Sequence, residues 1–146
     1  MQKERFNVNL AVHLALLQDD SVLLLQRHNT GYADGWYTFI AGHAEEGESL
    51  TEGMIRETEE EVGIIIKPED LTVAHIMYRQ SNRPYIDVFF TCSKWSGTPR
   101  NCELNKCTDL QFFPKDKLPE PCLSYVPLVL NYIQKGVPFS EHTTEI

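Results

Sequence analysis

Residues 42–64, with the sequence GHAEEGESLTEGMIRETEEEVGI, contain eight glutamates and a single arginine. Three of the glutamates, Glu59, Glu60 and Glu61, are consecutive. Carboxylate oxygens are the ligands that hard divalent cations such as Mg2+ prefer. A cation held between them lowers the pKa of a bound water and polarises a substrate oxygen. These residues could therefore hold a hard divalent cation.

A helix must position these carboxylates. Ser49 followed by Glu52 forms the S-x-x-E capping box, so we expect the helix to begin at about Leu50. Gly63 can adopt the left-handed conformation that closes a helix. At about 100° per residue, two neighbouring arcs result. The arc that faces a core holds Met54, Ile55, Thr58 and Val62, and the acidic arc holds Glu57, Glu60 and Glu61.

The simpler interpretation of such an acidic run is a solvated helix face. Glu57 and Glu61 are like charges at i,i+4, a spacing that costs ~0.2–0.5 kcal/mol. The acids also lie toward the negative end of the helix dipole. A bound divalent cation would reverse both penalties, so we predict a metal site. Gly53, one turn before Glu57, leaves this arc open, and we expect a ligand to approach it closely.

The segment resembles the Nudix box of the Nudix (MutT-like) hydrolases, G-x5-E-x7-R-E-U-x-E-E-x-G-U, where U is a bulky aliphatic residue. Every charged and glycine position agrees, while Thr58 adds a hydroxyl at a U position. The sequence IAGH stands where many members have Pro-Gly-Gly, and the flanking VLLLQR and LQFFP also look like the family. The matching residues are Gly42, Glu48, Arg56, Glu57, Thr58, Glu60, Glu61, Gly63 and Ile64.

The resemblance implies an α+β Nudix fold, an α/β/α sandwich with a mixed β-sheet that holds the box as a loop-helix-loop. It also implies a hydrolase of phosphoanhydride bonds. Such an enzyme uses Mg2+, with Mn2+ as a substitute, to cleave a nucleoside diphosphate linked to another moiety. The natural substrate would be a free nucleotide such as a (d)NTP, or a nucleotide derivative.

Residue roles follow from the resemblance by matching position. Glu57 and Glu61 look like the principal metal ligands, and Glu60 like a further ligand or the group that activates water. The carbonyl of Ala41 looks like another ligand, while Arg56 and Glu48 are similar to the pair that holds the box in shape and complete the expected catalytic set. Related-looking members add a carboxylate from a later loop. Glu103, in WSGTPRNCELNK, is our candidate, with a solvated loop glutamate as the equal alternative.

Outside the box the residues indicate less. Arg27, Arg79 and Arg83 could neutralise phosphates, and Arg27 ranks first because it ends the strand before the box loop. With Gly42 and Gly53, Arg27 completes the expected substrate-binding residues. Five aromatics could stack on a base, although an aromatic in a strand is usually core: Tyr32, Trp36, Phe39, Tyr78 and Tyr85. The histidines show no metal-ligand spacing, and the cysteines are interpreted as buried small hydrophobes.

Strands with turn residues between them surround the helix. We expect strands at residues 8–17, 21–27, 36–41, 71–78, 86–91 and 110–113, and a second helix at residues 125–134. The polar residues 137–146 are predicted to be a loosely held tail. Without a repeat or a long linker, residues 1–146 should form a single domain.

Composition limits the kinds of partner that the protein is expected to bind. A net charge of −8 argues against binding a nucleic-acid polymer, which needs clustered Lys and Arg. The apolar runs are too short to span a bilayer and no leader pattern is present, so we expect a cytoplasmic protein without a membrane partner. A small nucleotide is the expected partner, and a homodimer is left open.

Three function classes follow. The first is the metal-dependent pyrophosphohydrolase described above. The second is a non-catalytic Nudix-fold nucleotide-binding or regulatory module, a class that usually loses metal ligands, whereas this chain keeps them. The third is a nucleic-acid enzyme such as a cap hydrolase, which would be expected to carry basic flanks that the sequence lacks.

Overall fold

The computed structural model describes residues 3–143 of the 146-residue chain. Within these residues no helix is long and apolar enough to cross a membrane. The elements, in chain order, are β1 (Asn9–Gln18), β2 (Ser21–Arg27), β3 (Tyr37–Thr38), β4 (Ile40–His43), α1 (Leu50–Val62), the 3-10 helix η1 (Pro68–Asp70), β5 (Thr72–Arg79), β6 (Tyr85–Cys92), β7 (Cys107–Pro114), α2 (Tyr125–Lys135) and β8 (Phe139–His142).

The strands form one mixed sheet in the order β3-β2-β1-β6-β5-β8, with β4 paired to β1 and β7 paired to β2. β1 runs parallel to β6 and antiparallel to β4 and β2. β5 runs antiparallel to β6 and parallel to β8. The long β1 therefore lies at the centre and contacts both β4, which leads into the box, and β6.

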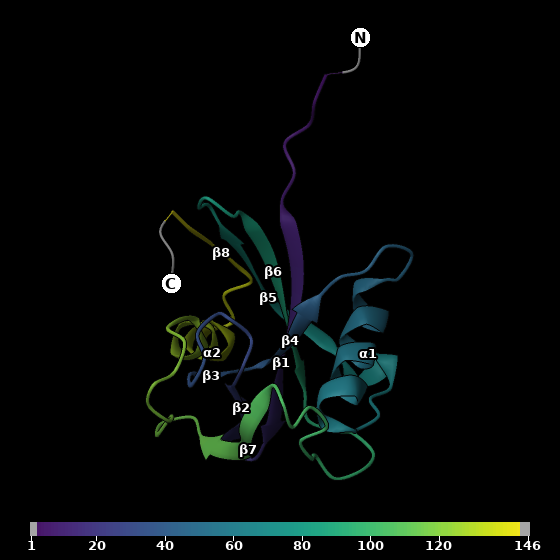
Figure 1. Ribbon diagram of the computed structural model, residues 1–146, viewed down its shortest axis with the longest axis vertical. Coiled ribbons are helices and arrows are strands. Elements are labelled where there is room, and N and C mark those ends of the chain that lie inside the picture. Colours follow the sequence, from purple (N-terminus) through teal and green to yellow (C-terminus); the bar gives the residue numbers. More distant parts are fainter. Residues whose placement is uncertain (1–2, 144–146) are drawn as a thin grey trace.

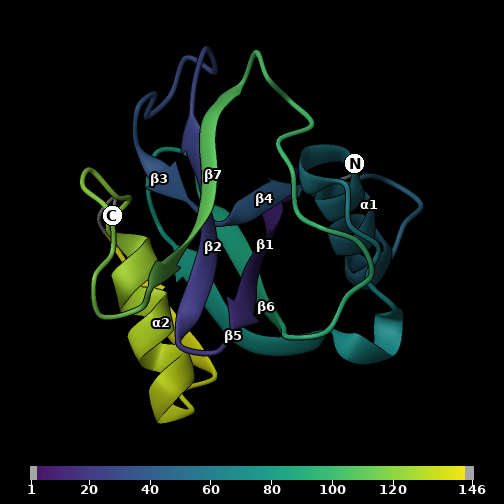
Figure 2. The same cartoon turned by 90° about the horizontal axis from the view of Figure 1, so that it is seen from below.

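The two α-helices cover opposite faces of this sheet (Figures 1 and 2). Alternation along β1 explains the two cores, because successive side chains of a strand point to opposite faces. Val12 and Leu14 pack in one cluster with Met54 of α1, whereas Ala15 packs in the other with Val126 of α2. The predicted α/β/α sandwich with a mixed sheet is confirmed.

The predicted strand at residues 36–41 is divided into two. β3 pairs with β2, and β4 pairs with β1. Phe39 lies between them and is fully buried in the core under α2. The chain therefore changes neighbours within this segment, and β4 carries Ala41 and Gly42 to the start of the box.

The prediction of a loosely held tail is wrong for residues 139–142, which form β8 at the edge of the sheet; residues 144–146 lie outside the described residues. The buried His75 of β5 anchors this segment. One ring nitrogen, Nδ1, lies 2.7 Å from the carbonyl oxygen of Val137, and Nε2 lies 2.8 Å from Ser140 Oγ. The ring also stacks on Tyr132 of α2. A histidine without an expected role thus joins β5, β8 and α2.

Candidate functional site

Helix α1 has the bounds and caps that the sequence predicts. Glu52 N donates to Ser49 Oγ at 3.0 Å, and Ser49 N donates to Glu52 Oε1 at 3.4 Å. Gly63 closes the helix in the left-handed conformation with φ 71°. Thr58 faces the core, where its hydroxyl donates to the Met54 carbonyl at 2.7 Å. The hydroxyl that departs from the aliphatic pattern is therefore satisfied within the helix.

Arg56 connects the loop before α1 to the carboxylates of α1. Its Nε and Nη2 donate to the two oxygens of Glu48 at 3.0 and 2.8 Å, and its Nη1 donates to Glu57 Oε1 at 2.8 Å. Hydrogen bonding to Arg56 lowers the pKa of Glu48, and hydrogen bonding to Glu48 raises the pKa of Arg56. The expected contact between Arg56 and Glu48 is present, and Arg56 also fixes the position of Glu57.

The two box glycines that were expected to contact substrate lie against different glutamates. A Cβ atom on Gly42 would overlap the carboxyl group of Glu57, so β4 can approach α1 this closely only without a side chain here. A Cβ atom on Gly53 would lie 2.9 Å from Glu48 Oε1. Glu48 fills the space that Gly53 was expected to leave for a ligand, so the prediction of a substrate contact at Gly53 is wrong.

The acidic arc of α1 faces one end of a cavity, where Glu61 is the most enclosed acid. Burial, and then the charges of Glu57 and Glu103, raise the pKa of Glu61 well above its ordinary value. Glu61 Oε2 is buried and has no hydrogen-bond partner among the residues that the structure describes. Burial also raises the pKa of Glu57, with Arg56 acting in the opposite direction. Glu60 is more exposed and lies 3.4 Å from Arg56 Nη1.

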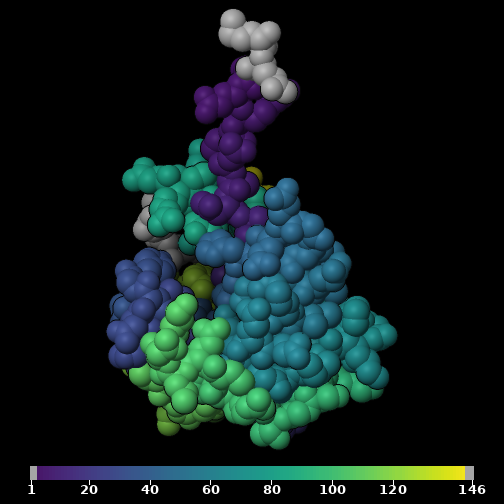
Figure 3. All heavy atoms as spheres, turned by 45° about the vertical axis from the view of Figure 1, so that its right-hand side comes forward, coloured from purple at the N-terminus to yellow at the C-terminus, as the bar shows by residue number. Residues whose placement is uncertain are grey.

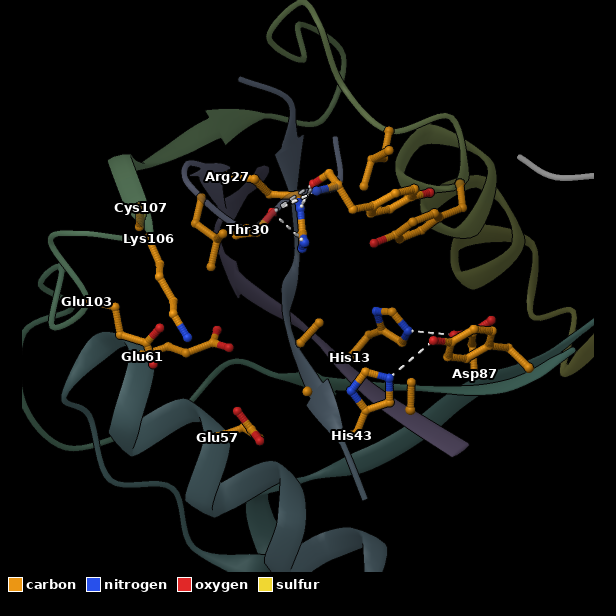
Figure 4. Close-up of a pocket in the computed structure, with 18 of the residues that line it drawn as sticks. His13, Arg27, Thr30, His43, Glu57, Glu61, Asp87, Glu103, Lys106 and Cys107 are labelled. Carbon is orange, nitrogen blue, oxygen red and sulfur yellow. Dashed lines mark hydrogen bonds and ion pairs between the residues drawn. The ribbon is translucent and has the colours of Figure 1, made fainter. Parts of the chain in front are cut away.

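Glu103 lies on the loop before β7 and faces the same end of the cavity. Figure 4 shows its side chain beside that of Glu61, with Lys106 reaching toward both. Its charge contributes to the raised pKa of Glu57 and of Glu61. The structure therefore brings this late-loop acid to the box carboxylates. Asp109 instead accepts a hydrogen bond from Tyr37 at 2.6 Å and does not line the cavity.

These residues fit a divalent cation. Glu61 Oε2 is an unpaired buried oxygen beside two further carboxylates, a grouping that repels itself until positive charge is supplied. Ala41 lines the same end of the cavity, and backbone carbonyls and carboxylates are the oxygen donors that Mg2+ prefers. The donors are adjacent rather than already gathered, since among residues 3–143 no three acidic, His or Cys side chains surround a common point.

The cavity has a volume of about 780 Å3 and extends well beyond the acids. Figure 3 shows the surface hollowed where the loop of residues 28–36, α1 and the loop before β7 meet. Arg27 faces it, held by hydrogen bonds from Nε to the Tyr32 carbonyl at 2.8 Å and from Nη2 to Thr30 Oγ1 at 3.0 Å. The site therefore has carboxylates at one end, the guanidinium of Arg27 facing the same cavity, and a large adjoining space.

Residues 8–127 match the family model described as the NUDIX domain. The chain belongs to this family. The human 8-oxo-dGDP phosphatase NUDT18 is 28% identical to this NUDIX chain over 143 residues, which cover 93% of the chain and 42% of NUDT18. The NAD-capped RNA hydrolase NudC of Photobacterium profundum is 44% identical over 62 residues, covering 41% of the chain and 22% of NudC. The chain spans less than half the length of these relatives.

A solved structure shows how far the NUDIX fold extends along the chain. The MutT NUDIX hydrolase from Burkholderia pseudomallei superposes with a TM-score of 0.79 over 86% of this chain and 98% of that one. The two are 22% identical, so the likeness shows the fold alone. This NUDIX chain therefore shares its overall fold with that structure.

The substrate side of this NUDIX site differs from what the sequence indicated. Arg79, Arg83, Tyr32 and Tyr85 line the cavity as the sequence allowed. Phe39 is core, and neither Trp36 nor Tyr78 lines the cavity. The sequence pattern missed further cavity residues, among them His13, Asp87, Lys106 and Tyr125. For His13 and Asp87, the available signal was a polar residue within a predicted strand whose other residues are mostly apolar.

The cysteines of the NUDIX chain are free thiols that lie outside the carboxylate end or are buried. Cys92 and Cys107 are buried as expected, but Cys102 is exposed, which corrects its interpretation as a core residue. Burial raises the pKa of the Cys107 thiol, which donates to the Asp109 carbonyl. A protonated, hydrogen-bonded thiol is a poor nucleophile. Cys107 therefore lines the cavity without a catalytic role.

Proposed function

We propose that this chain is a divalent-metal-dependent pyrophosphohydrolase. Its substrate would be a nucleoside diphosphate linked to another moiety, either a free nucleotide such as a (d)NTP or a nucleotide derivative. The observation that carries the proposal is the unpaired, buried Glu61 Oε2 beside Glu57 and Glu103 at one end of a cavity of about 780 Å3. That combination supports a site built around a cation and open to a nucleotide-sized ligand.

Each residue has a defined part in this proposal. Glu57, Glu61 and the Ala41 carbonyl would hold Mg2+ or Mn2+, with Glu60 and Glu103 as further ligands or as the carboxylate base that takes a proton from the attacking water. A bound cation supplies charge neutralisation and an acidified water. Arg56 and Glu48 hold Glu57 in place through their hydrogen bonds. Arg27, held by the Tyr32 carbonyl, would neutralise a phosphate.

The experiment described below also distinguishes two other functions. A non-catalytic nucleotide-binding module would bind without turnover. A hydrolase of NAD-capped RNA is suggested by the similarity to NudC, an NAD-capped RNA hydrolase that matches only 41% of this chain. The net charge of −8 weighs against extended contact with an RNA backbone. The intact set of box acids weighs against a module without turnover.

The experiment is a panel of nucleotides incubated with the protein in Mg2+, in Mn2+ and in EDTA. The panel contains (d)NTPs, (d)NDPs including 8-oxo-dGDP, nucleotide sugars, dinucleotides and NAD-capped RNA. We expect cleavage of a free nucleotide or nucleotide derivative that stops in EDTA, with phosphate or pyrophosphate revealing the bond cleaved. Binding without turnover would support the module instead, and cleavage of the capped RNA alone would support the third function.

A further inference from the structure

The cavity continues past the carboxylates to a polar floor that no role above explains. This floor is formed by His13 of β1 and Asp87 of β6, which lie on adjacent parallel strands. Tyr32, Tyr85 and Tyr125 line the same region. Buried polar groups in a largely apolar core need a partner or a purpose, because each unpaired group destabilises the fold.

Asp87 fixes the hydrogen-bonding state of the floor. It is 1% exposed and accepts from Arg79 Nε at 2.5 Å and from Arg79 Nη2 at 3.1 Å. Burial alone would raise the pKa of Asp87, but His13 and Arg79 outweigh it and lower the pKa. An ionised carboxylate can only accept. His13 Nε2, at 2.8 Å from Asp87 Oδ1, must therefore carry a proton and donate it.

His13 is held rigidly, and its second nitrogen is left over. The residue is 6% exposed, and its ring stacks on Phe89 with centroids 4.4 Å apart. In a neutral imidazole that donates from Nε2, Nδ1 is an acceptor. His13 Nδ1 is buried and has no partner among residues 3–143. Figure 4 shows one edge of the ring turned to Asp87 and the other toward the cavity interior.

We propose that His13 Nδ1 is a specificity-determining acceptor, which receives a hydrogen bond from an N–H group of the substrate's base. The substrate class is then a nucleotide whose base presents a ring N–H or an exocyclic amino group at its far edge. This inference rests on the proposed nucleotide chemistry at the other end of the cavity. A site built to bond an N–H group rejects the analogue that lacks it, because its own buried polar atom then stays unpaired.

Three pairs of nucleotides that differ in the N–H donors of the base provide the test. They are the diphosphates of adenosine and purine riboside, those of guanosine and inosine, and 8-oxo-dGDP with dGDP. The kcat/KM ratio of each pair is measured at pH 8 with Mg2+. We expect the wild type to prefer the donor-bearing member of at least one pair by about 10- to 100-fold.

Two substitutions separate the nitrogens of His13. His13→Gln keeps a donor for Asp87 near the Nε2 position but removes the acceptor at Nδ1, so the preferred ratio should fall to within about threefold of unity. His13→Asn places an amide at the Nδ1 position and should keep part of the preference. His28→Gln, outside the cavity, is the matched control and should keep all of it.

Two results would overturn the inference. One is a wild type that discriminates within none of the pairs, a result that needs no variant to fold. The other is an unchanged ratio in a folded His13→Gln protein. Failure of the proposed hydrolysis is distinguishable, because equilibrium binding of the same pairs in Mg2+ reports the preference without turnover. Preferential binding without cleavage would end the hydrolase proposal and keep the role of His13.

Discussion

The surroundings of Glu61 suit a bound cation, but they destabilise the folded protein when no cation is bound. Glu61 Oε2 is buried without a hydrogen-bond partner among residues 3–143, and the charges of Glu57 and Glu103 act on it. Glu57 differs, because Arg56 donates to it. Glu57 and Glu61 therefore affect the free energy of unfolding of the metal-free protein differently. Substituting each by glutamine should measure the two effects separately.

Glu61→Gln is expected to stabilise the metal-free protein, because the amide cannot carry the charge that burial and the neighbouring Glu57 and Glu103 disfavour. A gain of about 1 kcal/mol corresponds to a rise of about 2–4 °C in melting temperature for a domain of this size. Glu57→Gln should give no such gain, since it weakens the contact with Arg56. Thermal unfolding in EDTA measures both. A fall in the melting temperature of Glu61→Gln would show that the acid is structural.

Glu103→Gln should lower turnover by about 10- to 100-fold, or about 1.4–2.7 kcal/mol, with little change in melting temperature. The reason is that the Glu103 carboxylate faces the box acids and makes no hydrogen bond to residues 3–143 that the substitution would break. Steady-state kinetics at saturating Mg2+ provide the measurement. Cys102→Ser, an exposed neighbour, serves as control. Wild-type turnover in Glu103→Gln would leave it a solvated loop residue.

At the scale of elements, α1 depends on local signals that its sequence displays. The capping box joins Ser49 and Glu52, and the helix then presents Glu57 and Glu61 one turn apart. Ser49→Ala should cost about 1 kcal/mol of unfolding free energy, because an amide at the first turn loses its acceptor. Chemical denaturation measures this, with the exposed Ser96→Ala as control. An equal stability of the two variants would contradict the capping role.

Patterns along the sequence explain why α1, β1, β2 and the box contacts were predictable. The features that could not be predicted depend on contacts between residues far apart in the sequence. The strand expected at residues 36–41 is divided because β2 and β1 compete for it from different sides of Phe39. β8 forms because His75, more than 60 residues away, bonds Val137 and Ser140. Gly53 faces Glu48 rather than substrate, and His13 meets Asp87 across strands. No spacing along the chain reveals these pairings.

At the scale of the whole molecule, the layers bring two chemistries to one cavity. α1 on one face of the sheet supplies acids, while β1 and β6 supply the polar floor at the other end. The loop of residues 28–36 and the loop before β7 close the sides (Figure 3). In the proposed function, a nucleotide would place its phosphates at the acids and its base at the floor.

In the proposed function, a cation held by the buried acids of α1 promotes the hydrolysis. The most direct measurement compares Glu61→Gln with Glu59→Gln, an exposed acid of the same helix that does not line the cavity, on the substrate found by the nucleotide panel. At saturating Mg2+ we predict at least a hundredfold loss of kcat, about 2.7 kcal/mol, for Glu61→Gln and wild-type kcat for Glu59→Gln. Wild-type turnover in a folded Glu61→Gln protein would contradict the account.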